Sequence, residues 1–142
     1  MTQRQFIYSQ DGLPFVPVIL SSMSSSARVY ALADSGSTVN VLPYNIGIEL
    51  GLDWESQKFS PGLTGILRDS PAFGVLLKGH IEPFPPVRLA FAWTQSNDIP
   101  VILGQTNFFS EFDVYFFGSQ KVFHITAKTG RNAEASCSGT PL

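Results

Sequence analysis

The sequence has little cysteine and little charge, and it lacks long apolar runs. Its 142 residues include a single Cys, Cys137, which excludes an intrachain disulfide and therefore a disulfide-stapled secreted scaffold. Charged residues make up 14% of the chain, against roughly 25% in an average soluble protein. No apolar run approaches the ~18 residues of a membrane-spanning helix, and the N-terminus lacks the apolar core of a signal peptide. These absences predict a soluble, cytoplasmic protein with no membrane segment.

The charge balance and the scarcity of histidine argue against further classes of function. A net charge of -2 and the lack of a Lys/Arg stripe in the sequence disfavour nucleic-acid binding. His80 and His124 lie far apart, with no Cys or second His at ligand spacing, so we expect no metal site. The sequence contains no phosphate-binding loop, dinucleotide fingerprint or serine-hydrolase elbow, and we expect no cofactor. A surface so poor in charge favours a homodimer that hides part of it.

Short apolar or alternating runs, bounded by turn residues and rich in Val, Ile, Phe and Tyr, dominate the chain. They predict an all-β barrel or sandwich within one domain. Two short helices are expected, at 44–50 after Pro43 and at 105–112 after Gly104. We place the domain at 1–129 and a small, polar, flexible tail at 130–142. The expected strands are 4–9, 15–21, 28–33, 39–43, 72–81, 87–94, 99–103, 113–117 and 121–127.

The segment ALADSGSTVNVLP, residues 31–43, is the strongest local signal for chemistry. It places Asp34 between an apolar strand and a tight turn of small residues, Ser35 and Gly36. Walls of Leu32, Val39 and Val41 would largely desolvate the Asp34 carboxylate, which is unfavourable unless hydrogen bonds or a function compensate. The small turn residues let backbone groups and a ligand approach that carboxylate.

A second motif follows at DIPVILGQ, residues 98–105, with Gly104 lying 70 residues after Asp34. An apolar strand ends there in glycine and leads into an amphipathic helix. These two motifs, in this order and at this separation, resemble the retropepsin-like aspartic proteases. The resemblance extends from about Phe15 to Thr126 and is greatest to the single-domain bacterial branch of that family.

The resemblance implies a closed β-barrel with a flap hairpin, one or two short helices and a two-fold symmetric dimer. Asp34 matches the catalytic aspartate, and Ser35 and Gly36 match the rest of its signature. Val41 and Ile102 match apolar walls of the substrate pockets. The flap falls between Trp54 and Phe73, and its tip, also substrate-binding, is expected at Gly62, Leu63, Thr64 and Gly65.

The implied reaction is hydrolysis of a peptide bond by water held between two carboxylates, one of which accepts a proton while the other donates one. The chain has only one Asp-Ser-Gly, so the second carboxylate must be Asp34 of another copy. We therefore expect a homodimeric endopeptidase that cuts polypeptides next to hydrophobic residues. Gln105 and Thr38 occupy positions where many retroviral members carry an ion pair, so the dimer contacts differ in kind.

Ser37 is expected to tune the dyad. A hydroxyl at this position can donate a hydrogen bond to the Asp34 carboxylate, favour its charged form and move the activity optimum toward acidic pH. One alternative stays open at this stage, a non-catalytic β-barrel that binds peptides or has a structural role. In that case Asp34 would be an ordinary turn residue, and its replacement would affect no activity.

Overall fold

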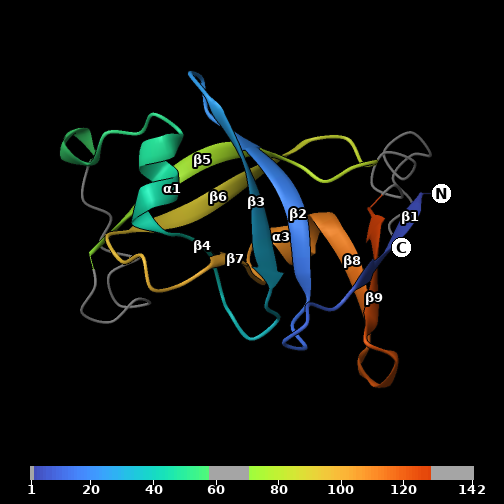
Figure 1. Cartoon of the computed structure of the whole chain (residues 1–142). Helices are drawn as coiled ribbons and strands as arrows, with labels where there is room; N and C mark the ends of the chain where they lie inside the picture. The colour runs from blue at the N-terminus through green and yellow to red at the C-terminus, as the bar shows by residue number, and fades with distance from the viewer. Residues whose placement is uncertain (1, 58–70, 129–142) are drawn as a thin grey trace.

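The computed structural model describes residues 2–57 and 71–128, and strands are its main elements (Figure 1). These residues include two short helices, α1 (Tyr44–Glu49) and α3 (Phe108–Glu111), and two 3-10 turns, η1 (Trp54–Ser56) and η2 (Gly118–Gln120). The strands are β1 (Gln3–Ile7), β2 (Phe15–Ser21), β3 (Ser26–Ala33), β4 (Asn40–Leu42), β5 (Ala72–His80), β6 (Val87–Thr94), β7 (Val101–Leu103), β8 (Phe112–Phe117) and β9 (Val122–Ala127).

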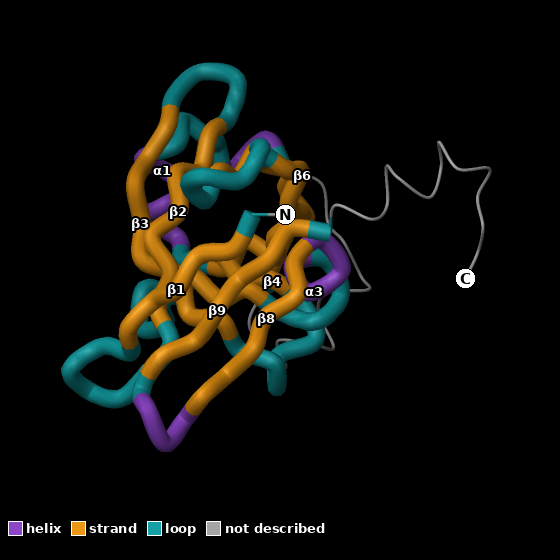
Figure 2. Tube along the Cα trace, turned by 90° about the vertical axis from the view of Figure 1, so that its right-hand side faces the viewer, coloured by secondary structure: helices purple, strands orange, loops and turns teal. Residues whose placement is uncertain are grey.

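Six of the strands close into a barrel in the order β2-β3-β7-β4-β6-β5. Most neighbours are antiparallel, but β7 runs parallel to β3 and β6 runs parallel to β4. The remaining three strands form a separate sheet in the order β1-β9-β8, and Figure 2 shows them side by side on one flank of the barrel. The all-β barrel predicted from the sequence is confirmed, with strand bounds within a few residues of those expected.

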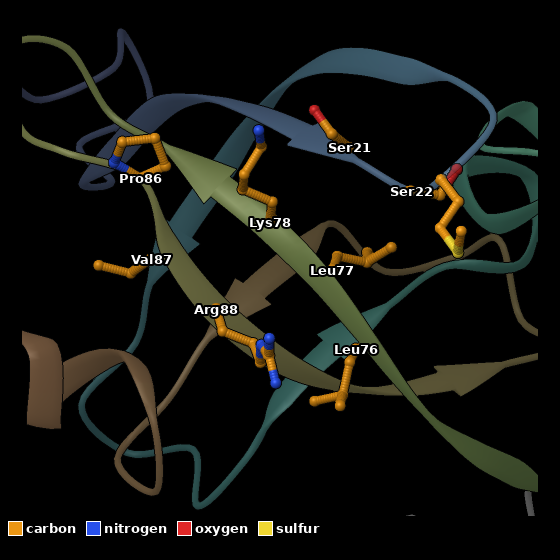
Figure 3. A pocket seen from close by; sticks show the side chains of 9 residues that line it. Ser21, Ser22, Leu76, Leu77, Lys78, Pro86, Val87 and Arg88 are labelled. Carbon is orange, nitrogen blue, oxygen red and sulfur yellow. The ribbon is translucent and has the colours of Figure 1, made fainter.

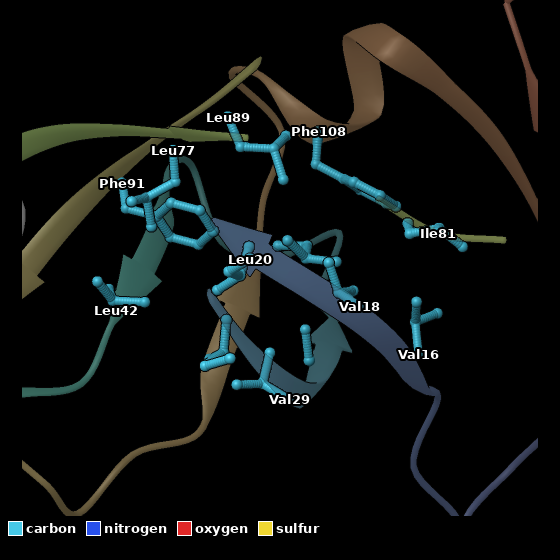
Figure 4. Close-up of a cluster of buried hydrophobic side chains, with 14 of the residues drawn as sticks. Val16, Val18, Leu20, Val29, Leu42, Leu77, Ile81, Leu89, Phe91 and Phe108 are labelled. Carbon is cyan, nitrogen blue, oxygen red and sulfur yellow. The ribbon is translucent and has the colours of Figure 1, made fainter. Parts of the chain in front are cut away.

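Alternating burial along the strands builds the core. On β2, the side chains of Val16, Val18 and Leu20 are buried, and the residues between them are half-exposed. Since successive side chains of a strand point to opposite faces, this pattern turns one face of the sheet inward. Figure 4 shows these three side chains in the same buried cluster as Leu77 and Leu89.

An aromatic cluster holds α1 against the barrel. The Trp93 ring stacks on Tyr44 with centroids 5.9 Å apart, and its indole N–H donates to the Tyr44 carbonyl over 3.2 Å. Gly47, in the middle of α1, packs so closely on Trp93 that a Cβ atom would lie 2.1 Å from the indole nitrogen. The glycine is needed for close approach, which explains a poor helix former at this position.

One predicted helix starts later than expected, and two other predicted segments lie outside the described residues. The second helix begins at Phe108 rather than at residue 105, because residues 105–107 form a turn bonded to the Asp34 loop. The predicted tail, 130–142, and the predicted flap tip, 62–65, lie outside the described residues. Neither helix in the part of the chain that the structure describes is long and apolar enough to cross a membrane.

Candidate active site

Asp34 directly follows the last residue of β3, at the end of the barrel away from the β2–β3 hairpin (Figure 1). Its backbone N–H donates to the Leu103 carbonyl over 3.0 Å, which fixes it against the end of the parallel strand β7. The residue is half-buried, less enclosed than the predicted desolvated carboxylate. An acid in this position has a defined backbone and remains accessible to a ligand.

The turn after Asp34 is organised around its carboxylate. The backbone N–H of Gly36 donates to Asp34 Oδ1 over 2.9 Å, and that of Ser37 donates to the Asp34 carbonyl over 3.0 Å. A Cβ atom on Gly36 would lie 3.3 Å from Oδ1, closer than most contacts of that kind. The small residues predicted from the motif are therefore the ones that this turn needs.

Backbone hydrogen bonds connect the second motif to the loop that follows Asp34. Gln105 N–H donates to the Ser37 carbonyl over 2.8 Å, and Thr106 N–H donates to the Thr38 carbonyl over 2.9 Å. The Thr106 hydroxyl also donates to the Thr38 carbonyl. A Cβ atom on Gly104 would lie 2.4 Å from the Val39 carbonyl oxygen, so only glycine lets the two segments approach this closely. The two motifs, 70 residues apart in the sequence, thus form one unit.

Asn40 is the centre of this unit, and the sequence analysis missed it. Its side chain is 1% exposed, and its Oδ1 accepts the Gly104 N–H over 2.7 Å. Its amide donates over 3.0 Å both to the Ala90 carbonyl and to Asn107 Oδ1. Buried polar groups persist where they are fully hydrogen-bonded, as this one is. The available signal was a polar residue inside the otherwise apolar run VNVLP.

A cavity of about 390 Å³ opens beside Asp34. Asp34 is the only acid among the residues that line it, and the other walls are mostly apolar. Phe116, which comes from the separate three-stranded sheet, is 40% exposed, and Leu13, from the loop before β2, is 41% exposed. The complete lining is Leu13, Pro14, Leu32, Ala33, Asp34, Ser35 and Phe116. A single carboxylate at the edge of an apolar cavity is suited to an extended apolar ligand.

The comparison with solved structures gives several matches, of which one is described here. A crystal structure described as that of a retropepsin-like aspartic protease from Rickettsia conorii superposes with a TM-score of 0.70. The match covers 87% of this chain and 90% of the other, at 12% sequence identity. The chain has a retropepsin-like fold. No protein-family model matches the sequence, and no curated protein matches it either.

Within this retropepsin-like fold, the predicted pocket walls Val41 and Ile102 face each other across β4 and β7. Val41 is 4% exposed and Ile102 is half-buried. Neither lines the cavity beside Asp34, whose apolar walls are Leu32 and Ala33 from the first motif and Leu13, Pro14 and Phe116 from outside both motifs. The predicted flap tip, Gly62 to Gly65, lies outside the described residues, but the segments that flank it meet where Trp54 contacts Phe73 at 4.5 Å between ring centroids.

The two residues that stand in place of the retroviral ion pair both have partners within the chain. The Gln105 side-chain amide donates to the Ser35 carbonyl over 2.7 Å, so it braces the residue next to Asp34. The Thr38 carbonyl accepts from Thr106, as described above. Neutral hydrogen bonds therefore stabilise this retropepsin-like loop. Among residues 2–57 and 71–128, no group of His, Cys, Asp or Glu side chains gathers where it could hold a metal ion.

Ser37 differs from its predicted role as a donor to Asp34. Its hydroxyl donates to the Val39 carbonyl over 2.8 Å, and the Asp34 carboxylate accepts from the Gly36 backbone instead. A hydroxyl has one proton to donate, so the bond to Val39 leaves none for Asp34. The argument for an acidic optimum that rested on Ser37 is therefore not supported by this geometry.

Replacing Ser37 by Ala should accordingly leave the pH dependence of peptide hydrolysis unchanged. We expect only a loss of about 1 kcal/mol in the free energy of unfolding, because one loop hydrogen bond disappears. The measurement is kcat/KM against pH for both proteins, since that ratio reports ionisations of the free enzyme. An upward shift of both limbs in Ser37→Ala would show instead that the hydroxyl serves Asp34 in the working enzyme.

Proposed function

We propose that the protein is an aspartic endopeptidase whose active site combines Asp34 from each of two copies. The observation that carries this proposal is the hydrogen-bonded unit around Asp34, which presents one accessible carboxylate beside an apolar cavity. The retropepsin-like fold supports the same kind of activity. Ser35 and Gly36 shape the turn that presents the carboxylate, and they touch no reacting atom in this scheme.

The reaction needs two carboxylates that share one proton. The ionised Asp34 accepts a proton from a water molecule, which attacks the carbonyl carbon of the peptide bond. The protonated Asp34 of the other copy donates toward the carbonyl oxygen. The resulting tetrahedral intermediate then breaks its C–N bond as a proton passes to the leaving nitrogen. Two carboxylates placed this closely cannot both ionise, so each copy supplies one half of an acid–base pair.

The surface around the cavity supports a second copy as the source of the other carboxylate. Leu13 and Phe116 line the cavity and are 41% and 40% exposed. Covering this apolar surface is favourable at about 25 cal/mol per Å² of area removed from water. A partner copy seated at this end of the barrel would bring its own Asp34 toward the site.

The cavity walls support a preference for hydrophobic residues next to the cleaved bond. Leu32 and Ala33 come from β3 itself, and Leu13, Pro14 and Phe116 complete an apolar lining. A polar or charged side chain placed there would lose hydration without gaining a hydrogen bond, which is unfavourable. The proposed substrate is therefore an extended polypeptide with an apolar residue beside the bond that is cut.

Peptidase activity should depend on protein concentration if each copy supplies half of the site. On dilution below the dimer dissociation constant, activity per mole of chain should fall in step with the dimer fraction. Sedimentation at the same concentrations measures that fraction.

A second test of the two-copy site adds an excess of the Asp34→Asn chain to the wild type. A tenfold excess should lower activity per wild-type chain by about tenfold, because most wild-type copies then pair with an inactive partner.

A charge-matched control for the mixing experiment is Asp98→Asn, which removes one exposed carboxylate outside the Asp34 loop. Its addition in excess should leave activity per wild-type chain no lower than before. Full activity in a chain that sedimentation shows to be a monomer would contradict the two-copy site.

A further inference from the structure

The outer face of four consecutive barrel strands carries charge of one sign only. The strands β6, β5, β2 and β3 are neighbours in the barrel, and they contain no Asp or Glu. Their only charged residues are Arg28, Lys78 and Arg88, and all three are exposed. None of the three forms an ion pair with another residue of the described chain. We refer to these three residues as the basic face, which is unexpected in a chain with a net charge of -2.

Two members of the basic face oppose each other directly. Lys78 on β5 is in register with Arg88 on β6. Directly opposed residues of antiparallel strands have Cβ atoms about 5 Å apart, and like charges in such a pair destabilise the sheet. Arg28 lies two residues further along, in the row where Ile19 separates it from His80. The isolated chain therefore keeps an electrostatic repulsion that an anionic partner would relieve.

A cavity of about 650 Å³ lies at this pair (Figure 3). Lys78 and Arg88 border it together with Ser21 and Ser22 from the end of β2 and the turn that follows. Its lining also includes Leu76, which is 62% exposed, and Met23, which is 106% exposed. Exposed apolar side chains beside two unpaired cations make a surface with both charged and hydrophobic character.

We propose that the basic face and this cavity form a docking site for an acidic segment of a polypeptide. Carboxylates of the segment would lie between Lys78 and Arg88, and Arg88 can bind a carboxylate through two parallel hydrogen bonds. Apolar side chains of the same segment would cover Leu76 and Met23. Charge complementarity of this kind selects the partner and speeds its association.

A polypeptide fits these observations better than a nucleic acid or a lipid surface. A nucleic-acid-binding domain usually has a basic pI and many cations along one track, whereas this chain has a pI of about 5.5 and three cations on this face. Phosphate groups would match the charge but would leave the apolar walls of the cavity uncovered. Glu- and Asp-rich peptides supply carboxylates and apolar side chains together.

The docking site is separate from Asp34, and it does not depend on the proposed peptidase activity. Lys78 pairs with Ser21 on β2, and Ser21 pairs with Ser26 at the start of β3. Asp34 follows the end of β3, eight residues after Ser26. At roughly 3.3 Å per residue, the path along β3 between these two positions is about 26 Å long. Binding at the basic face can therefore be measured in a chain that has no Asp34 carboxylate.

The test measures binding of a fluorescein-labelled peptide of alternating Glu and Leu by fluorescence anisotropy. The protein is the full chain carrying Asp34→Asn, so that the peptide is not cut. We expect binding to weaken by about tenfold in Lys78→Gln/Arg88→Gln and also when salt is raised from about 0.01 M to 0.15 M. Lys121→Gln/Lys128→Gln removes the same charge from exposed sites outside the four strands, and it should bind like the parent.

Three results would overturn the proposal. The first is equal binding of the same peptide with Gln in place of Glu. The second is equal weakening by both double variants, which would indicate an effect of net charge alone. The third is tighter binding of an oligonucleotide or of vesicles containing phosphatidylserine than of the acidic peptide, which would assign the face to phosphate groups.

A stability measurement separates docking from a structural role. Lys78→Glu replaces the repulsive pair by an attractive one, so it should raise the unfolding midpoint of the free protein by about 1 to 3 °C. The same change should abolish binding of the acidic peptide. Lys128→Glu should do neither. A lowered midpoint in Lys78→Glu, or retained binding, would contradict the proposal.

Discussion

The Asp34→Asn variant is expected to lose peptide hydrolysis while keeping its fold. An amide cannot accept the proton of the attacking water, and a general base or acid contributes about 10²- to 10⁴-fold to the rate. Because both halves of the proposed site change together, we expect kcat to fall by at least about 10³-fold. The fold survives because the Asn side-chain oxygen can still accept the Gly36 N–H that Asp34 Oδ1 now accepts over 2.9 Å.

The controls for this variant separate chemistry from structure. Asp98→Asn removes an exposed carboxylate outside the site and should retain wild-type kcat. Asp34→Ala loses the bond from Gly36 as well, so it should be inactive and also slightly less stable. Wild-type cleavage of a hydrophobic peptide by a well-folded Asp34→Ala protein, sensitive to pepstatin, would show that Asp34 is not the catalytic residue and would overturn the proposed site.

Replacing Gly104 by Ala should disable the site without touching any side chain that takes part in catalysis. The new Cβ atom would lie 2.4 Å from the Val39 carbonyl oxygen and 2.8 Å from the Ser37 carbonyl oxygen. Both are backbone atoms, so the Asp34 loop must move away. We expect a loss of about 3 kcal/mol or more in the free energy of unfolding. A shift of about 1 Å at Asp34 should also lower kcat by about 10²-fold.

Gly118→Ala is the matched control, because a Cβ atom on Gly118 would meet nothing within 4 Å. It should leave both stability and activity close to those of the wild type. Chemical denaturation with the kinetic assay measures both effects in each variant. Wild-type activity and stability in Gly104→Ala would show that the contact between the two motifs does not position Asp34.

The sequence predicted the fold class and the position of the acid because both depend on local patterns. Alternating apolar residues identified β2 and β3, and the turn at residues 21–26 joins them in register as Ser21 with Ser26. The short helix after Pro43 was also predicted from local chemistry. A motif of one Asp and two small residues was enough to select Asp34.

The hydrogen-bond partners of Ser37 and Asn40 depend on contacts between segments that are distant in the sequence. Whether Ser37 donates to Asp34 or to Val39 depends on how its loop folds back on residues 104–106, because both acceptors lie within three residues of Ser37 in the sequence. The role of Asn40 requires Gly104 and Asn107 to lie beside it, 64 and 67 residues away. Such partners cannot be predicted from the pattern of residue types, because a buried amide is stable only when its particular donors and acceptors are assembled around it.

The sequence by itself thus determined an all-β chain with one candidate catalytic aspartate, since strand periodicity and turn chemistry act over a few residues. Only the tertiary structure showed that Phe116 from a separate sheet borders the cavity beside Asp34, and that Lys78 stands opposite Arg88. Both facts follow from strand register and from the closure of the barrel. Register is set by the packing of the whole core, so a shift by one residue would exchange the inner and outer faces of a strand.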